Sequence, residues 1–368
     1  MNILILNWRD INHPLAGGAE RALLKHAEFW KKKGASITWF CSYYPGAKKE
    51  EVIDGISYIR KGSQYTVHLY SFVYLVGRRI HQYDIVIDNF HFIPFFTPFY
   101  CDSNKVIALI HEVAGKMWYK NLPPIPAFFG YVFEPWYFKL YKRIPFITVS
   151  NSTKTELLEM GIPKENIFVI YNGVAHVKEV SQKKETVPTI LFLGRLSYDK
   201  GINDALQAFV CIHKKNPKIR FWVVGKEEKN GIYETLIKNY PQIVSAIKYW
   251  GYVDEPKKFE LLKRSWILIH PSAKEGWGLT VIEAASQGTP TVGYDVEGLR
   301  DSIVSNTTGI LTAKNSKALA YAILQLLSNK KLYNTMCKES VEWTKQFDWG
   351  KSIKQSWELI RKQYESHL

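Results

Sequence analysis

The chain has 368 residues, which is more than one hydrophobic core usually holds, so two domains are expected. A hydrophobic content of 46% is normal for a globular protein, and no apolar run reaches the ~18 residues of a transmembrane helix. The net charge of +15 favours an anionic partner, whether nucleic acid, an acidic membrane surface or a phosphorylated substrate.

Two features favour the cytoplasm. The four cysteines are scattered, with no spacing typical of a metal site, which is the pattern of reduced thiols. The first residues, MNILILNWRD, lack the positively charged segment of a signal peptide. They predict a first strand over 3–6 instead.

The first half of the chain alternates apolar strands with helices. Further strands are predicted over 36–41, 55–60, 85–87, 106–110, 146–149 and 167–170. Helices are predicted over about 20–33, 70–82 and 154–159. The polar, charged stretch 176–187 follows, and we predict the linker there.

The second half repeats this alternation. Strands are predicted over 190–193, 220–224, 245–250, 267–269 and 291–293. Helices are predicted near 203–214, 230–239, 255–264, 279–287 and 317–327. Alternating β and α units of this length imply parallel, doubly wound sheets. Two such sheets place a ligand cleft at the carboxyl ends of their strands.

The stretch 270–292 is the most informative. It reads as a strand end, a polar loop with Gly276 and Gly278 around Trp277, and a helix that starts near Leu279. Backbone N–H groups at such a helix start suit a phosphate. Two acids, Glu275 in the loop and Glu283 on the helix, would bracket a hydroxyl-rich ligand. Taken alone, the helix pattern favours a solvated helix with a glutamate near its N-terminus.

Two other loops follow strands in the same way. Gly17 and Gly18 open the first helix, where a phosphate can approach the backbone closely, although such turns often serve packing only. Arg195 and Lys200 follow the first strand of the second half. Together they would hold a diphosphate from two sides, and the alternative is two ordinary surface cations.

Single residues at other strand ends are weaker candidates. His111 follows the strand 106–110, at the edge of the sheet where ligands bind, although a lone histidine is more often structural. We predict that His111, rather than Glu112, faces the ligand. Val253 lies after Gly251, beyond another strand end.

The region 116–143 is unusually aromatic and basic. It holds ten aromatic residues: Trp118, Tyr119, Phe128, Phe129, Tyr131, Phe133, Trp136, Tyr137, Phe138 and Tyr141. It also holds five cations: Lys116, Lys120, Lys139, Lys142 and Arg143. This mixture is typical of a membrane interface, and an ordinary buried helix with its loop explains it equally well.

Three motifs occur in order: G-G-A-E-R at 17–21, G-R-L…K-G at 194–201, and E-G-W-G-L…E at 275–283. Together they resemble glycosyltransferase family 4, the retaining enzymes with the E-x7-E signature. The resemblance implies a GT-B fold, in which two Rossmann-like doubly wound parallel-sheet domains face each other across a cleft. It also implies an acceptor domain over 1–178, completed by a helix over 350–368, and a donor domain over 186–349.

The resemblance further implies a retaining hexosyl transfer from a nucleotide-sugar donor. The implied catalytic residues are His111 and Glu275. The implied donor-binding residues are Gly17, Gly18, Arg195, Lys200, Val253, Gly276, Trp277, Gly278, Leu279 and Glu283. Glu283 is expected on the ribose hydroxyls, Glu275 near the reacting sugar, and His111 beside the sugar or the acceptor. The chain departs from the family where the usual G-x-P-E reads Gly298-Leu299-Arg300-Asp301.

No metal and no cofactor are expected, because the sequence has no D-x-D motif and the cations would neutralise the diphosphate. The expected partners are a glycan or lipid-linked acceptor and an anionic membrane surface at 116–143, and nucleic acid is not expected. The expected location is cytoplasmic, at the inner face of the membrane. The alternatives are a sugar-nucleotide epimerase with a GT-B fold and a non-catalytic sugar- or nucleic-acid-binding protein.

Overall fold

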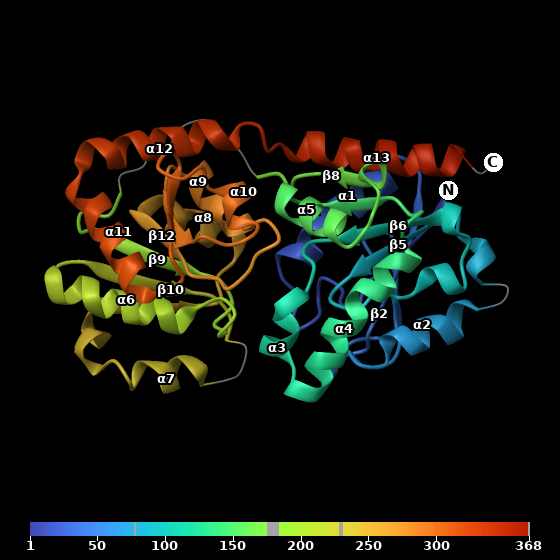
Figure 1. The fold of residues 1–368 in the computed structure, drawn as a ribbon, viewed down its shortest axis with the longest axis horizontal. Helices are drawn as coiled ribbons and strands as arrows, with labels where there is room; N and C mark the ends of the chain where they lie inside the picture. The colour runs from blue at the N-terminus through green and yellow to red at the C-terminus, as the bar shows by residue number, and fades with distance from the viewer. Residues whose placement is uncertain (77–78, 175–183, 228–230, 367–368) are drawn as a thin grey trace. The chain divides into compact units, whose positions relative to one another are not determined.

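The structure is a computed structural model, and it describes all residues except 77–78, 175–183, 228–230 and 367–368. The chain forms two compact units (Figure 1). Unit 1 consists of Met1–Asn172 with Gly350–Leu368, and unit 2 consists of Gly173–Trp349. Residues 176–183 of the predicted linker lie outside the described residues. The predicted fold class is confirmed, since each unit is an α/β domain with a mostly parallel sheet.

The sheet of unit 1 has the strand order β3-β4-β2-β1-β5-β6-β7-β8. The strands are β1 (Asn2–Leu6), β2 (Ser36–Cys41), β3 (Glu50–Ile53), β4 (Ile56–Arg60), β5 (Ile85–Phe90), β6 (Val106–Ile110), β7 (Phe146–Thr148) and β8 (Ile167–Val169). From β1 the chain winds outward to β2 and then returns to β5 on the other side. The order therefore reverses between β1 and β5, where doubly wound sheets bind ligands.

One edge of this sheet differs from the prediction. β3 pairs antiparallel with β4, and the sequence analysis did not predict β3. Asp54 and Gly55 join the two strands with φ of 49° and 73°. Positive φ at both positions is the geometry of a tight hairpin turn, which Asp-Gly favours. A local hairpin therefore ends a sheet whose other pairings are parallel.

The helices of unit 1 are α1 (Gly18–Lys32), α2 (Val67–Leu75), α3 (Trp118–Asn121), α4 (Pro124–Leu140), α5 (Asn151–Glu159) and α13 (Trp349–Glu365). Short 3-10 turns lie at Ile80–Gln82, Thr97–Phe99, Ser103–Lys105, Gly115–Met117 and Lys164–Asn166. The final helix, α13, packs on α1. Ser356 Oγ lies 2.8 Å from His26 Nδ1 and 3.1 Å from Trp30 Nε1, and Ile360 is buried in the same core.

The sheet of unit 2 is entirely parallel, in the order β11-β10-β9-β12-β13-β14. Its strands are β9 (Thr189–Leu193), β10 (Arg220–Val224), β11 (Ile247–Gly251), β12 (Ile267–His270), β13 (Thr291–Tyr294) and β14 (Gly309–Thr312). The strand order reverses between β9 and β12. This pair of strands therefore marks the ligand-binding edge of unit 2.

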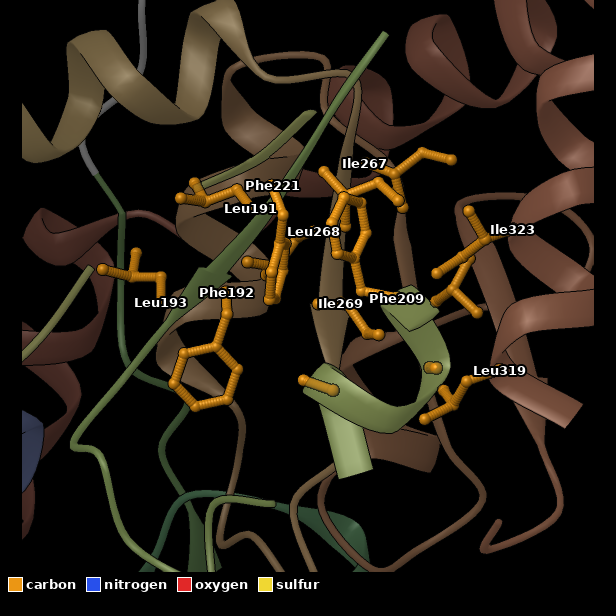
Figure 2. Close-up of a cluster of buried hydrophobic side chains, with 14 of the residues drawn as sticks. Leu191, Phe192, Leu193, Phe209, Phe221, Ile267, Leu268, Ile269, Leu319 and Ile323 are labelled. Atoms are coloured by element: carbon orange, nitrogen blue, oxygen red, sulfur yellow. The ribbon is translucent and has the colours of Figure 1, made fainter. Parts of the chain in front are cut away.

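The helices of unit 2 are α6 (Ile202–Lys215), α7 (Ile232–Ile237), α8 (Glu255–Arg264), α9 (Leu279–Ser286), α10 (Leu299–Ser302), α11 (Ser316–Ser328) and α12 (Lys330–Thr344), with a 3-10 turn at Pro241–Ala246. Side chains of β9 and β12 meet Phe209 of α6 and Leu319 of α11 in one core (Figure 2). The Phe209 ring stacks on Phe221 at 4.9 Å. Within the described parts of both units, no helix is long and apolar enough to cross a membrane.

Candidate functional site

The ligand-binding edge of unit 2 carries a charged cluster. Lys200 Nζ lies 2.6 Å from Glu275 Oε1, and His270 Nε2 lies 3.1 Å from the same oxygen. We call Arg195, Lys200, His270 and Glu275 the Glu275 cluster. His270 ends β12, and Arg195 follows the neighbouring strand β9. The cluster therefore sits at the point where the strand order of this sheet reverses.

Glu275 is ionised over a wide pH range. Burial by itself would raise its pKa, but the Lys200 ammonium and the His270 ring outweigh burial and hold the pKa of Glu275 well below its usual range. Its side chain is 13% exposed, so Glu275 is not completely enclosed by the protein. A fixed negative charge with a cation beside it can accept hydrogen bonds from hydroxyl groups or face a developing positive charge.

Two glycines hold the loops of this cluster together by close backbone approach. A Cβ atom on Gly201 would lie 2.1 Å from the Pro271 carbonyl oxygen, and one on Gly298 would lie 2.2 Å from the Glu275 carbonyl oxygen. Both glycines also have positive φ, 73° and 75°. The segment after β9 and the segment after β13 therefore both pack against the loop that carries Glu275, with no room for a side chain.

Arg195 lies at the margin of this cluster. One of its terminal nitrogens is 3.5 Å from Asp199 Oδ2, and its side chain is one-third exposed. Its Nε atom is buried and has no hydrogen-bond partner among the described residues. A buried donor without a partner is costly, and an anion is the natural acceptor for a guanidinium.

The glycine-rich loop leads into helix α9 as predicted. Gly278 caps the helix with φ of 76° and ψ of 55°, and a Cβ atom there would lie 3.0 Å from Leu299 and from Ser302. Gly276 and Leu279 are half-buried. Trp277 is buried, and its ring meets Phe347 edge-on at 5.0 Å. The indole of Trp277 is thus part of the core, and its neighbours present backbone at the helix N-terminus.

Glu283 lies in the second turn of α9 and has its own cation. Lys258 of α8 places Nζ 2.6 Å from Glu283 Oε1, and both side chains are about one-tenth exposed, 12% and 10%. The two glutamates of the motif are therefore paired with different lysines from different elements. Val253 lies between the end of β11 and the N-cap of α8, Asp254, and is partly buried against the core of unit 2.

A second polar cluster lies where the strand order of unit 1 reverses. Glu20, in the first turn of α1, is fully buried and accepts hydrogen bonds from Arg9 Nε at 2.9 Å and from the Gly17 N–H at 2.7 Å. His91 Nε2 lies 3.3 Å from the same carboxylate. Burial would raise the pKa of Glu20, but Arg9 and His91 hold this pKa well below its usual range. The start of α1 thus already holds a carboxylate, while Gly17 and Gly18 are exposed.

His111 belongs to this cluster of unit 1. Its ring stacks on His91 at 6.4 Å, and Thr153 Oγ1 donates to its carbonyl oxygen at 2.9 Å. The His111 Nε2 atom is buried and has no hydrogen-bond partner among the described residues. Burial, aided by His91, lowers the pKa of His111 to about 4, so the ring is neutral at pH 7. We call Arg9, Glu20, His91 and His111 the His111 cluster.

The sequence analysis missed His91. It follows β5 as His111 follows β6, so the same strand-end rule applies to both. The predicted strand ended at residue 87, whereas β5 continues to Phe90 and includes the buried polar residue Asp88, whose hydrogen bonds are satisfied inside the unit. Asp88 accepts hydrogen bonds from Thr97 Oγ1 at 2.8 Å and from Tyr141 Oη at 2.6 Å.

Unit 1 also contains an apolar pocket of about 600 Å³. Its lining residues are His68, Leu69, Phe72, Phe95, Phe96, Phe99 and Tyr100. Among these lining residues, His68 is the one that could become a cation; its ring lies 4.6 Å from that of Phe95, and burial lowers the pKa of His68 to about 4. The pocket is therefore uncharged at pH 7 and suits a hydrocarbon group.

Of the predicted site residues, Gly17, Gly18 and His111 lie in unit 1, and the others lie in unit 2. Lys200 and Glu275 are in direct contact, and Glu283 is paired separately. No group of three or more metal-binding side chains occurs in the described part of the chain.

The family models match both halves of the chain. The model described as "Glycosyltransferase Family 4" matches residues 16–177, and the model described as "Glycosyl transferases group 1" matches residues 175–343. The chain belongs to glycosyltransferase family 4. The predicted resemblance to glycosyltransferase family 4 is thereby confirmed.

Relatives of this family 4 chain include the glycogen synthase of Mycobacterium tuberculosis, 29% identical over 55% of this chain and 50% of that protein. The phosphatidyl-myo-inositol mannosyltransferase of Mycobacterium leprae is 25% identical over 60% of this chain and 58% of that protein. The chain thus matches about half the length of such relatives.

Solved structures share the fold over nearly the whole chain. Sucrose-phosphate synthase from Thermosynechococcus elongatus superposes with a TM-score of 0.79 at 18% identity, covering 99% of each chain. Anabaena HepE, solved in complex with UDP and glucose, gives a TM-score of 0.68 at 17% identity, covering 98% of this chain and 100% of its own. These likenesses confirm the GT-B fold of this family 4 chain.

Proposed function

We propose that this protein is a retaining glycosyltransferase that moves a hexosyl group from a nucleotide-sugar donor to a glycan or lipid-linked acceptor. The observation that carries the proposal is the Lys200–Glu275 contact of 2.6 Å at the ligand-binding edge of unit 2. It places a cation and a carboxylate side by side, next to the N-terminus of α9. A sugar diphosphate needs both charges, one for its phosphates and one for its hydroxyl groups.

The donor diphosphate would lie against Arg195, Lys200 and the first backbone N–H groups of α9. When the bond between the sugar and the phosphate breaks, negative charge grows on the leaving diphosphate. Donors that are already in place stabilise this charge in the transition state more than in the ground state. Arg195 supports this role because its buried Nε is a donor without a partner among the described residues.

The two glutamates would bind different parts of the donor, namely its ribose and its sugar. Glu283, held by Lys258 at 2.6 Å, would accept hydrogen bonds from the ribose hydroxyls. Glu275, kept ionised by Lys200, would contact the sugar hydroxyls or face the positive charge that develops on the ring. Val253 and the backbone of Gly276, Gly278 and Leu279 would complete the donor site.

His111 would position the donor sugar or the acceptor. Its neutral ring has a buried Nε2 without a partner among the described residues, so it can make a hydrogen bond without carrying charge. In a retaining transfer the acceptor oxygen attacks on the face that the diphosphate leaves. The acceptor proton then passes to a phosphate oxygen of the leaving group. Gly17 and Gly18, which are exposed, would contact a phosphate group of the substrate.

Other parts of the proposal concern the donor, the metal and the acceptor. A uridine nucleotide is the first donor to test, since the similar HepE structure contains UDP and glucose. We propose that no metal is required, because Arg195, Lys200 and α9 supply the positive potential.

An acceptor with a hydrocarbon part is favoured by the apolar pocket of unit 1 and by the named activity of the Mycobacterium leprae relative. Such an enzyme would work in the cytoplasm, at the inner face of the membrane.

The test is nucleotide release from a panel of nucleotide sugars, with and without candidate acceptors. A transferase releases nucleotide faster when its acceptor is added, whereas an epimerase needs no second substrate, and none of the relatives named above is an epimerase. The variants Glu275→Ala and Lys200→Ala should both lose most of this activity. Near-wild-type release by both variants would show that the assigned site is wrong.

A further inference from the structure

One face of α4 is apolar and turned to solvent. Six side chains on this face are each between 50% and 73% exposed: Ile125, Phe128, Phe129, Val132, Phe133 and Trp136. Their spacing of three and four residues places them along a single stripe of the helix. A stripe of this kind usually faces a core, so its exposure marks an interaction surface.

The opposite face of α4 fixes the helix to unit 1. Ala127, Tyr137 and Phe138 are buried, and Tyr137 meets Phe96 edge-on at 6.1 Å. Glu134 accepts hydrogen bonds from the N–H groups of Ala114 at 2.8 Å and Gly115 at 2.7 Å, and from the Trp118 indole at 3.0 Å. The helix is therefore held in place on unit 1 with its apolar stripe exposed.

The exposed charges of the segment 116–143 all have one sign. Glu134 is the only acid in 116–143, and it is buried. All five cations of the segment are exposed: Lys116, Lys120, Lys139, Lys142 and Arg143. The ten aromatics of the segment are divided, with Trp118, Tyr137, Phe138 and Tyr141 in the core and the remaining six exposed. α4 therefore has a buried face, as the hypothesis of an ordinary buried helix predicts, and a second face that is apolar and exposed.

We propose that the apolar stripe of α4 docks this protein on an anionic lipid bilayer, with the stripe among the acyl chains and the five cations at the headgroups. A helix with this arrangement lies in the plane of the interface. α4 has 17 residues, and no helix in the described ranges can cross a membrane, so the docking is peripheral. A second copy of this chain fits less well, because self-docking would bring two sets of five cations together. Single-stranded nucleic acid stacks on aromatic rings, whereas Ile125 and Val132 offer none.

The test is co-sedimentation of the full chain with vesicles, without donor or acceptor, so that its result is independent of the proposed catalysis. Vesicles of phosphatidylcholine alone are compared with vesicles in which about a third of the lipid is phosphatidylglycerol. Wild type should bind the anionic vesicles, and binding should weaken as salt is raised. Failure to sediment with anionic vesicles at physiological salt overturns the proposal.

Two variants separate the apolar and electrostatic parts. The double variant Phe129→Ser with Phe133→Ser should bind anionic vesicles about tenfold more weakly. The triple variant Lys139→Gln, Lys142→Gln and Arg143→Gln should lose about tenfold or more. The matched controls are Tyr321→Ser, and the triple variant Lys330→Gln, Lys331→Gln and Lys338→Gln, all at exposed sites of unit 2. Losses in the controls as large as those in the variants would reject the stripe as the docking surface.

Tryptophan fluorescence provides a third readout, and it needs only a substitution that keeps an aromatic ring. Brominated acyl chains should quench Trp136 fluorescence in wild type, and the Trp136→Phe variant should lose that part of the quenching while it still binds. Equal quenching in both proteins contradicts insertion of this face. Self-association that Phe129→Ser with Phe133→Ser abolishes, without vesicle binding by wild type, would assign the stripe to a protein contact instead. A gel shift with single-stranded DNA that survives physiological salt would equally overturn the bilayer proposal.

Discussion

Lys200 reaches Glu275 over 75 residues of sequence, and its Nζ lies 2.6 Å from Glu275 Oε1. The contact joins the segment that follows β9 to the segment that follows β12, the two strands between which the order of the sheet reverses. Each partner changes the chemistry of the other, since the ammonium keeps the carboxylate ionised and the carboxylate fixes the ammonium in place.

Removing Lys200 should affect both activity and the response to acid. Because Lys200 is the main cause that lowers the pKa of Glu275, the variant Lys200→Met should raise this pKa. Wild-type Glu275 gives stability that is complete above the ordinary carboxyl range and is lost progressively as pH falls from that range toward the lowered pKa. In Lys200→Met the folded and unfolded pKa values of Glu275 lie closer together, so the variant should be less stable at pH 7 and its unfolding midpoint should fall less on acidification than that of wild type. Thermal unfolding between pH 3 and pH 7 measures this, and superimposable curves would contradict the assigned pairing.

The Glu283 carboxylate should matter for donor binding more than for folding. The variant Glu283→Gln keeps the size of the side chain but removes the charge that would hold the ribose hydroxyls. We expect KM for the donor to rise about tenfold to a hundredfold, in line with the loss of one charged hydrogen bond. Glu260→Gln is the control, because Glu260 is a more exposed acid that pairs with Lys257 and Arg264 on α8. Similar KM values in both variants would remove Glu283 from the donor site.

Gly298 should be intolerant of any side chain. In Gly298→Ala the new Cβ atom would meet the Glu275 carbonyl at 2.2 Å, so the loop that carries Glu275 must move. We expect a loss of at least about 2 kcal/mol in stability together with most of the activity. Gly231→Ala provides the control, since Gly231 also has positive φ, 79°, but nothing lies within 4 Å of its Cβ position. That control should lose about 1 kcal/mol and remain active.

Buried histidines should make unit 1 sensitive to mild acid. Burial lowers the pKa values of His26, His68 and His111 to about 4, against the ordinary value of 6.5. Between pH 6.5 and pH 4 the unfolded chain binds more protons than the folded chain. The free energy of unfolding should therefore fall as pH is lowered through this window. His68→Gln should flatten the fall, while His81→Gln, at an exposed site, should leave the slope unchanged. A slope that none of the buried histidines alters would contradict this account.

The alternating pattern of strands and helices was readable from the sequence because the central strands are short apolar runs, buried on both faces, and most helices carry an apolar stripe. Helix α8 was predicted with its observed bounds, since Asp254 and Pro256 mark its start. The strand β3 was missed because Glu50 and Glu51 give it no apolar alternation, although the Asp54-Gly55 turn marks a hairpin.

The tertiary contacts of the site could not be predicted from local sequence patterns. The Lys258–Glu283 pair joins two helices, and the Arg9–Glu20 pair joins a loop to α1. Neither pair has a characteristic spacing, so only the folded sheet brings the partners together. The exposure of individual aromatic residues could not be predicted either. Composition alone does not distinguish Phe133, which is exposed on the apolar stripe of α4, from Phe138, which is buried in the core.

The central claim is that the Glu275 cluster binds the diphosphate of a nucleotide-sugar donor. Calorimetric titration with uridine diphosphate, and with the other nucleoside diphosphates, tests it most directly. We predict that wild type binds one of these nucleotides and that Lys200→Ala and Arg195→Ala each weaken the binding at least about tenfold. Lys330→Ala, at an exposed position of α12, should bind as wild type does. Unchanged affinity in both Lys200→Ala and Arg195→Ala would contradict the assignment.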